Sequence, residues 1–193
     1  MGLTVLPQVL RPRRYTDHRG WFSETFHEQR LRDRGITCHF VQDNQSSSEK
    51  AGTLRGMHFQ IPPAAQAKLI SVVQGRIIDV VVDIRRGSPT FGKHVSTVLS
   101  AATGEQLYVP VGFAHGFLTL EDKTIVLYKT SSYYTPTCER GVLWDDPNLS
   151  IDWPVKKNEV ILSDKDRSLP LLAEIDLLFE YDGQPLAPLA RES

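Results

Sequence analysis

Apolar and polar residues alternate along the middle of the chain, a pattern typical of β-strands that are buried on one face. The clearest example is the segment 76–85, where aliphatic residues recur at every second position and alternate with Asp79 and Asp83. The apolar segment 68–74 and Gly75 come just before it, which predicts a strand, a tight turn and a second strand. Further short strands are expected at 95–100, 106–109, 117–120 and 124–130. Many short strands favour an all-β sandwich or barrel over a βαβ array.

Only a few segments favour helix. Residues 27–34 predict a helix that Gly35 would end, and residues 163–166 predict a helical turn. We also expect a short helix over 171–179. A strand should begin at 40–42, and the polar run 43–48 should form a loop. The chain has 193 residues, so we expect a single domain spanning 1–193.

Composition narrows the classes of partner. The 22 Lys and Arg residues nearly balance the 23 Asp and Glu residues, so the net charge favours neither nucleic acid nor a membrane surface. Cys38 and Cys138 lack CxxC spacing, which indicates ordinary thiols in a reducing compartment. We see no apolar signal-peptide core at the N-terminus and no apolar run long enough to span a bilayer. We therefore expect a cytoplasmic protein.

The stretch 52–68, GTLRGMHFQIPPAAQAK, contains several side chains suited to binding or catalysis. Arg55 presents a forked set of donors suited to phosphate, and Lys68 presents a compact positive charge. His58 can transfer protons near neutral pH. Such a set suits a substrate with phosphates at one end and an acidic C–H bond at the other. The competing interpretation is a strand with one core histidine and two solvated cations.

Motifs that are absent exclude other chemistries. The sequence has no GxGxxG, no GxxxxGK[ST], no HExxH and no GxSxG. A nicotinamide site, a P-loop and a nucleophile-elbow hydrolase are therefore not expected.

The segment 104–115, GEQLYVPVGFAH, resembles the second signature of the cupins, which are small double-stranded β-helix barrels. Cupins that bind a metal carry His-x-His and then a glutamate in the first signature. The matching residues are His58-Phe59-Gln60, and Ala64-Ala65 stand where the acid would be. A divalent metal needs several histidine or carboxylate ligands. The resemblance therefore implies a mainly β, cupin-type jelly-roll barrel with short peripheral helices and with no metal or cofactor.

A longer series of motifs is more specific. RGWFSETF (19–26), QDN (42–44), LRGMHFQ (54–60), QAKL (66–69), SPTFG (88–92), GFAHGF (112–117), LYK (127–129), YY (133–134), WDDP (144–147) and LSDKD (162–166) occur in the order of one family. Together they resemble the dTDP-4-dehydrorhamnose 3,5-epimerases, cofactor-free enzymes of dTDP-L-rhamnose synthesis. The resemblance covers 19–166. Two departures are Met57, where the family usually has leucine, and Ala67, where it usually has glycine.

The resemblance implies a role for each matching residue. His58 is the implied base, Tyr128 the acid, Lys68 the group beside the C4 oxygen, and Asp166 the partner that orients His58 and strengthens it as a base. The implied substrate-binding residues are Arg19, Trp21, Glu24, Asp43, Asn44, Gln45, Arg55, Gln60, His115, Tyr134, Glu139 and Lys165. Among them, the two arginines would hold the diphosphate, and Trp21 and Tyr134 would stack on the base. A homodimer is also implied, with N-terminal residues crossing between subunits.

These groups match what epimerisation beside a ketone requires. The C4 carbonyl acidifies the protons on C3 and C5, so a base can remove one and leave an enolate. A proton returned to the opposite face inverts the carbon. The reaction needs a base, an acid on the other face and a positive group near the enolate oxygen.

The alternation expected of a strand raises one conflict within the stretch 52–68. Strict alternation would place Arg55 and His58 on opposite faces of their strand, although both should reach the substrate. A β-bulge at Gly56 would re-aim one of them.

Three other interpretations remain open. An enzyme that inverts only C3 or only C5 of a dTDP-4-keto-6-deoxy sugar would use the same groups. A non-catalytic cupin that binds nucleotide sugars would not need an acid and a base together. A ketoisomerase on the same fold should carry paired histidines where His58-Phe59-Gln60 stands.

Overall fold

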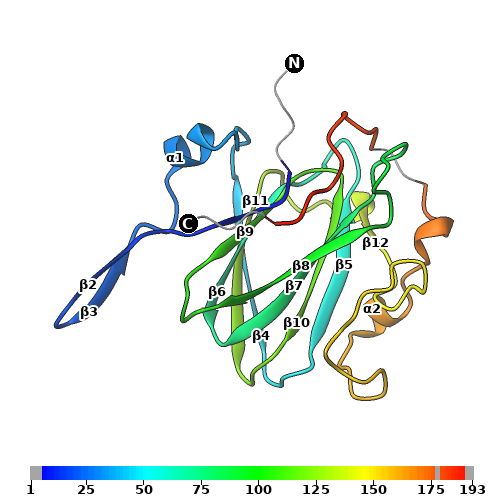
Figure 1. Cartoon of the computed structure of the whole chain (residues 1–193). Helices are drawn as coiled ribbons and strands as arrows, with labels where there is room; N and C mark the ends of the chain where they lie inside the picture. Colours follow the sequence, from blue (N-terminus) through cyan, green and yellow to red (C-terminus); the bar gives the residue numbers. More distant parts are fainter. Residues whose placement is uncertain (1–5, 177–178, 190–193) are drawn as a thin grey trace.

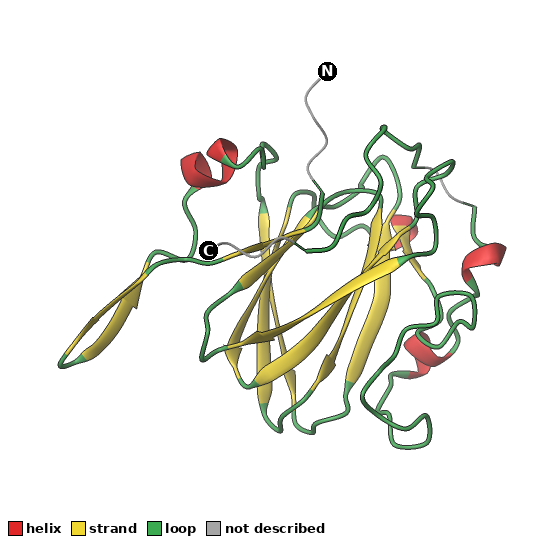
Figure 2. Ribbon diagram, in the orientation of Figure 1, coloured by secondary structure: helices red, strands yellow, loops and turns green. Residues whose placement is uncertain are grey.

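The computed structural model describes residues 6–176 and 179–189, and its body is a barrel of two antiparallel sheets that face each other (Figures 1 and 2). The first sheet has the order β1 (Gln8–Leu10), β9 (Gln106–Val109), β6 (Lys68–Gln74), β11 (Thr124–Thr130) and β4 (Gln42–Ser48). The second has the order β12 (Glu139–Gly141), β5 (Leu54–Gln60), β10 (Phe113–Thr119), β7 (Arg76–Asp83) and β8 (His94–Ser100). The cupin-type barrel that the sequence predicts is confirmed.

Elements outside the barrel are short. The strands β2 (Arg14–Asp17) and β3 (Gly20–Ser23) form a hairpin that projects away from the barrel, and α1 (Glu28–Asp33) follows it (Figure 1). On the other side lie α2 (Asp164–Arg167) and two 3₁₀ turns, Pro136–Cys138 and Leu172–Glu174. The predicted helix at 27–34 and the predicted helical turn at 163–166 are confirmed within a residue or two. The expected helix over 171–179 is wrong for its described part, which holds only one 3₁₀ turn; residues 177–178 lie outside the described residues.

Among the described residues there are three apolar cores, and two of them pack against the two faces of the second sheet. One lies between the sheets at one end and includes Ile70 and Val126 of the first sheet and Val81 and Phe117 of the second. The other lies on the outer face of the second sheet, where the segment 142–175 packs over it. Burial of such side chains contributes about 1.5–3 kcal/mol each.

The side chains of β7 alternate between the outer and the inner face of the second sheet. Val80 and Val82 pack outward under the C-terminal segment, whereas Asp79 lies on the interior face, where its carboxylate meets a histidine of the neighbouring strand. The interior of this barrel is thus partly polar, because it holds a site as well as a core.

The predicted strands at 68–74 and 76–85 do form, but they do not pair with each other. Gly75 sends the chain from the first sheet to the second, so β6 pairs with β9 and β11, and β7 pairs with β8 and β10. Gly75 has φ +79°, and a Cβ atom there would lie 2.4 Å from the Thr124 hydroxyl oxygen. Glycine is therefore required at this corner.

The expected polar loop at 43–48 is instead the strand β4. It pairs with β11 along its whole length, from Gln42 opposite Thr130 to Ser48 opposite Thr124. Its side chains are polar on both faces because the inner face borders a cavity rather than a core. Backbone pairing therefore outweighed side-chain composition here.

Candidate active site

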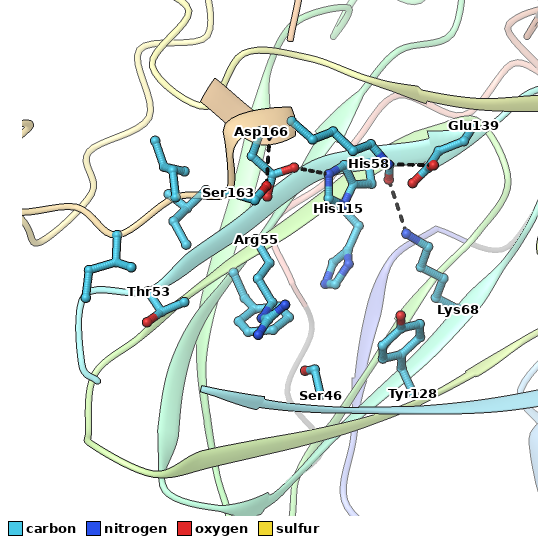
Figure 3. A pocket seen from close by; sticks show the side chains of 15 residues that line it. Ser46, Thr53, Arg55, His58, Lys68, His115, Tyr128, Glu139, Ser163 and Asp166 are labelled. Carbon is cyan, nitrogen blue, oxygen red and sulfur yellow. Dashed lines mark hydrogen bonds and ion pairs between the residues drawn. The ribbon is translucent and has the colours of Figure 1, made fainter. Parts of the chain in front are cut away.

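Two cavities open inside the barrel and meet at four residues. One has a volume of about 440 Å³ and the other about 330 Å³. Both are lined by His58, Lys68, Tyr128 and Glu139. Figure 3 shows the larger cavity, with side chains from both sheets and from α2 converging on it.

His58 forms a dyad with Asp166. The two residues are 108 positions apart in sequence, and His58 Nε2 lies 2.6 Å from Asp166 Oδ1 (Figure 3). Asp166 is only 4% exposed, and the Ser163 hydroxyl accepts a hydrogen bond from its backbone N–H at the start of α2. Burial opposes ionisation, but the hydrogen bond from His58 holds the pKa of Asp166 below its usual value. Because Nε2 faces the carboxylate, Nδ1 is the nitrogen available to take a proton.

A β-bulge in β5 turns Arg55 and His58 toward the same cavity. The register between β5 and β10 pairs His115 with His58 and Phe117 with Arg55, and it shifts in between. Gly56 has φ +130°, and a Cβ atom there would lie 2.5 Å from the Gly116 Cα atom. The bulge expected at Gly56 is confirmed, and it removes the conflict between Arg55 and His58.

Lys68 reaches the site from β6 on the opposite sheet. Its Nζ donates a hydrogen bond to the His58 backbone oxygen at 3.2 Å. Part of the side chain is accessible through the cavity, yet protein surrounds the ammonium. This burial lowers the pKa of Lys68 to about 8, and the negative charges of Asp79 and Glu139 oppose the shift.

Tyr128 lies on β11, in the first sheet, and faces the cavity across from the second sheet that carries His58. In Figure 3 its ring rises into the cavity with the hydroxyl directed toward Lys68. Burial raises the pKa of Tyr128 above its usual value, although the charge of Arg55 opposes this. The phenol is therefore protonated at neutral pH and can donate.

A second histidine, His115, borders the cavity beside His58. Its Nε2 lies 2.6 Å from Asp79 Oδ1, and Asp79 is fully buried. Burial lowers the pKa of His115, while the Asp79 carboxylate opposes the shift. His115 is thus held in a fixed orientation by its own carboxylate.

Arg55 lies at the other end of the larger cavity, where the polar edge of β4 holds it. Its Nε donates to the Ser48 hydroxyl at 3.3 Å, and its Nη2 donates to the Ser47 backbone oxygen at 3.0 Å. Next to it is Ser46 (Figure 3). The Ser46 hydroxyl oxygen is buried and has no hydrogen-bond partner among the described residues. Leaving a buried hydroxyl unpaired costs about 1–3 kcal/mol, so a ligand atom is the expected partner.

Glu139 links the two cavities to the rim. The Tyr134 hydroxyl donates to Glu139 Oε2 at 2.7 Å, and Lys165 Nζ lies 2.5 Å from the same oxygen. Burial opposes ionisation, but the hydrogen bond from Lys165 lowers the pKa of Glu139. Tyr134, Glu139 and Lys165 therefore form a connected polar group at the mouth.

The structure brings most of the residues suggested by the sequence together. His58, Lys68, Tyr128 and Asp166 line the larger cavity with Arg55, His115, Glu139 and Lys165, and Asn44, Gln60 and Tyr134 line the smaller one. The Gln60 amide, 3% exposed for the whole residue, donates to the backbone oxygens of Ala64 and Tyr133.

Five of the suggested residues do not face these cavities. Arg19 and Trp21 lie on the projecting hairpin and Glu24 follows it. Asp43 and Gln45 are on the exposed face of β4, where Asp43 pairs with Lys129.

Sequence reasoning missed Gln42, Ser46, Asp79 and Ser163. The signal for the first two was the even spacing of Gln42, Asn44 and Ser46, which places them on one face once 42–48 is recognised as a strand. Asp79 holds His115, and Ser163 caps the start of α2. Neither contact can be read from the sequence.

No cluster of three or more metal-ligating side chains occurs in the described part of the chain. Within 6–176 and 179–189, no helix is long and apolar enough to cross a membrane. Cys38 and Cys138 are free thiols.

Comparison with known proteins gives concordant matches. Residues 6–174 match the family model described as dTDP-4-dehydrorhamnose 3,5-epimerase. A Sinorhizobium fredii relative with that same name is 48% identical over 174 residues, which is 90% of this chain and 89% of the relative. A crystal structure of dTDP-6-deoxy-D-glucose-3,5-epimerase from Legionella pneumophila, in complex with dTDP-4-keto-L-rhamnose, has a TM-score of 0.87 and 45% identity, covering 92% of this chain and 94% of that one. A 3'-monoepimerase from Streptomyces bikiniensis, in complex with dTDP-quinovose, has a TM-score of 0.80 and 36% identity, covering 90% and 88%.

Proposed function

Since the chain belongs to the dTDP-4-dehydrorhamnose 3,5-epimerase family, we propose that it inverts C3 and C5 of dTDP-4-dehydro-6-deoxy-D-glucose to give dTDP-4-dehydro-L-rhamnose, in dTDP-L-rhamnose biosynthesis. The observation that carries the proposal is the placement of His58 and Tyr128 on facing sheets around one cavity. A base and an acid so placed act on opposite faces of a sugar ring that lies between them.

His58 starts the reaction by removing a proton from the carbon beside the C4 ketone. The C–H bond breaks, an N–H bond forms at Nδ1, and the electron pair moves to the ketone oxygen. Asp166 holds the ring by Nε2 and stabilises the imidazolium that forms. No oxidation state changes, so side chains alone can carry the step.

Lys68 and Tyr128 complete the inversion. The Lys68 ammonium stabilises the negative charge that develops on the C4 oxygen. Tyr128 then donates its phenolic proton to the opposite face of the carbon, and the proton taken by His58 returns to the tyrosine through solvent. A second round at the other carbon gives the doubly inverted product.

The diphosphate end of the substrate belongs near Arg55. Ser47 and Ser48 hold the guanidinium by Nη2 and Nε, so it presents its remaining N–H groups to phosphate oxygens with little loss of side-chain entropy. The unpaired Ser46 hydroxyl lies beside it and supplies a further donor.

The active protein is proposed to be a homodimer in which the hairpin completes the partner's site. Arg19, Trp21 and Glu24 do not line the two cavities that contain His58 of their own chain, and Trp21 and Phe22 are 57% and 68% exposed. Large aromatic side chains exposed on a projecting hairpin support a surface that another protein covers. A symmetric dimer would bury both hairpins.

The competing function is inversion of a single carbon, which the match to a 3'-monoepimerase favours as the second candidate. Turnover of dTDP-4-dehydro-6-deoxy-D-glucose in deuterated water, followed by NMR, distinguishes the two. We expect deuterium at both C3 and C5 of the product. Deuterium at one carbon only would replace the double epimerase with the single-centre enzyme.

The same assay separates the acid from the base. Tyr128→Phe retains His58 and Lys68, so it should exchange deuterium into recovered substrate while forming little inverted product. His58→Asn should abolish both exchange and inversion, with a loss beyond the ~10²–10⁴ typical of general catalysis. Tyr181→Phe, remote from the cavity, is the matched control. Full inversion by Tyr128→Phe would assign the acid to another group.

A further inference from the structure

The loop 131–135 carries Tyr134 to the rim of the smaller cavity. It follows β11 and leads into the 3₁₀ turn Pro136–Cys138. The side chains of Tyr133 and Tyr134 are 67% and 53% exposed, so the loop has little apolar burial to fix it. Loops of this kind are normally among the more mobile parts of a protein.

Three glutamine side chains nevertheless hold the backbone of this loop, and we call them the glutamine clamp: Gln42 of β4, Gln60 of β5 and Gln66 of the loop before β6. The clamp bonds four consecutive loop residues. Gln66 Nε2 donates to the Ser132 oxygen at 2.7 Å, and Gln60 Nε2 donates to the Tyr133 oxygen at 3.2 Å. The backbone N–H groups of Tyr134 and Thr135 donate to Gln42 Oε1 at 3.0 Å and to Gln60 Oε1 at 2.8 Å.

Gln60 is the centre of the clamp. Its amide nitrogen also donates to the Ala64 oxygen at 2.6 Å, so both amide hydrogens are committed to backbone groups. Only a side chain with a donor at one position and an acceptor at the other satisfies this set. Gln60 is thus occupied with the protein's own backbone instead of a ligand.

The clamp connects directly to groups that line the site. Gln42 Nε2 donates to Asn44 Oδ1 at 2.9 Å, and the clamped loop directs the Tyr134 hydroxyl onto Glu139. Gln42, Gln60 and Gln66 all line the smaller cavity. The position of the loop therefore sets the shape of this cavity's mouth.

We propose that the glutamine clamp is a positioning device that holds Tyr134 against the bound sugar nucleotide and so sets substrate affinity without taking part in proton transfer. This inference rests on the proposed function. A clamped loop loses little conformational freedom when the substrate binds, whereas a released loop must be ordered at that moment.

The test is steady-state kinetics of Gln60→Met, which keeps the side chain's length but removes its hydrogen bonds. Losing the three hydrogen bonds of Gln60 should raise KM by roughly ten-fold or more. The value of kcat should stay within about three-fold of wild type, because His58, Lys68 and Tyr128 are untouched. Gln74→Met, which alters an exposed glutamine at the far end of β6, is the matched control and should leave both constants unchanged.

A double-mutant cycle with Tyr134→Ala tests whether the clamp acts through the tyrosine. If it does, Gln60→Met should raise KM much less in the Tyr134→Ala background than in wild type. Additive effects on KM, an unchanged KM in folded Gln60→Met, or a loss confined to kcat would each overturn the proposal. Gln66→Met, which removes a single bond, replaces Gln60→Met if thermal unfolding shows that the latter does not fold.

Calorimetric titration with dTDP separates this inference from the proposed function. Wild type that binds dTDP but does not turn over the keto sugar would reject the epimerase assignment, and weaker dTDP binding by Gln60→Met would still support the clamp. Equal dTDP affinities of wild type and Gln60→Met, together with equal KM values, would reject the clamp alone. Wild type that neither binds dTDP nor turns over the sugar would reject both.

Discussion

Lys68 has neighbours that act on its charge in opposite directions. Burial among strands disfavours the ammonium, whereas Asp79 and Glu139 favour it, and the result is a pKa of about 8. A lysine with this value is charged at neutral pH but loses its charge within the range of an ordinary assay. Lys68 is therefore a charged group of the cavity wall whose ionisation responds to alkaline pH.

We predict an alkaline limb near pH 8 in kcat/KM that belongs to Lys68. Below that pH the ammonium stabilises the enolate, and above it the neutral amine does not, so activity falls as pH rises. Tyr128 does not explain such a limb, because burial raises its pKa. The measurement is kcat/KM in Lys68→Arg between about pH 6 and pH 10, where a guanidinium stays charged.

Lys68→Arg should lower the maximum rate but remove the limb, and Lys50→Arg, on the surface, should leave the profile as it is. A limb of unchanged position in Lys68→Arg would assign it to another group.

At the level of secondary structure, the bulge in β5 is the feature on which the site depends. It allows two residues three positions apart to face one cavity, which a regular strand does not permit. Gly56 and Gly116 allow the two strands to come this close, since a Cβ at Gly56 would collide with the Gly116 Cα atom.

Gly56→Ala should therefore destabilise the fold more than another substitution at positive φ. The strained backbone and the collision together should cost roughly 3 kcal/mol or more. Gly87 also has positive φ, at +78°, but a Cβ there meets nothing within 4 Å. Gly87→Ala should cost no more than about 1–2 kcal/mol. Urea unfolding of the two variants makes the comparison, and equal midpoints would contradict a close approach at Gly56.

For the whole molecule, the feature that bears on assembly is the hairpin of β2 and β3. Arg19 and Trp21 lie on this hairpin, which projects away from its own barrel, so the dimer proposed above would bring them to the site of the second chain (Figure 1). In the dimer proposed above, each site is composite: one subunit supplies the catalytic residues, and the other supplies some of the residues that bind the nucleotide.

Mixing two inactive variants tests this arrangement. Arg19→Ala retains His58, and His58→Asn retains Arg19, so a heterodimer has one fully intact site if the hairpin serves the partner. Equal mixing after unfolding and refolding should recover about a quarter of wild-type activity, since half the dimers are mixed and each has one working site.

If Arg19 serves its own chain, mixed dimers contain no intact site and activity should stay at the level of the separate variants. A monomer in sedimentation measurements would also contradict the proposal.

The sequence by itself determined an all-β fold, since the period of two in the segment 76–85 commits its residues to a strand before any partner is known, and the resemblance to the cupins implied the barrel. It also determined the chemical groups, because His58, Lys68, Tyr128 and Asp166 stand in motifs that resemble one family. The polar strand 42–48 was missed because its inner face borders a cavity, so no apolar alternation marks it. Pairing with β11 alone decided it.

Tertiary structure decided which groups act together. The His58–Asp166 pair spans 108 positions and forms only because the C-terminal segment docks on β5. There the Leu54 N–H donates to the Ile161 oxygen, and the Ile161 N–H donates to the Gly52 oxygen. Likewise Gln60, suggested by the sequence as a ligand contact, donates one amide hydrogen to the Tyr133 backbone oxygen, which lies 73 positions away and comes near it only in the fold. Periodicity is a local property and can be read along the chain, whereas contact between distant segments depends on how the sheets close.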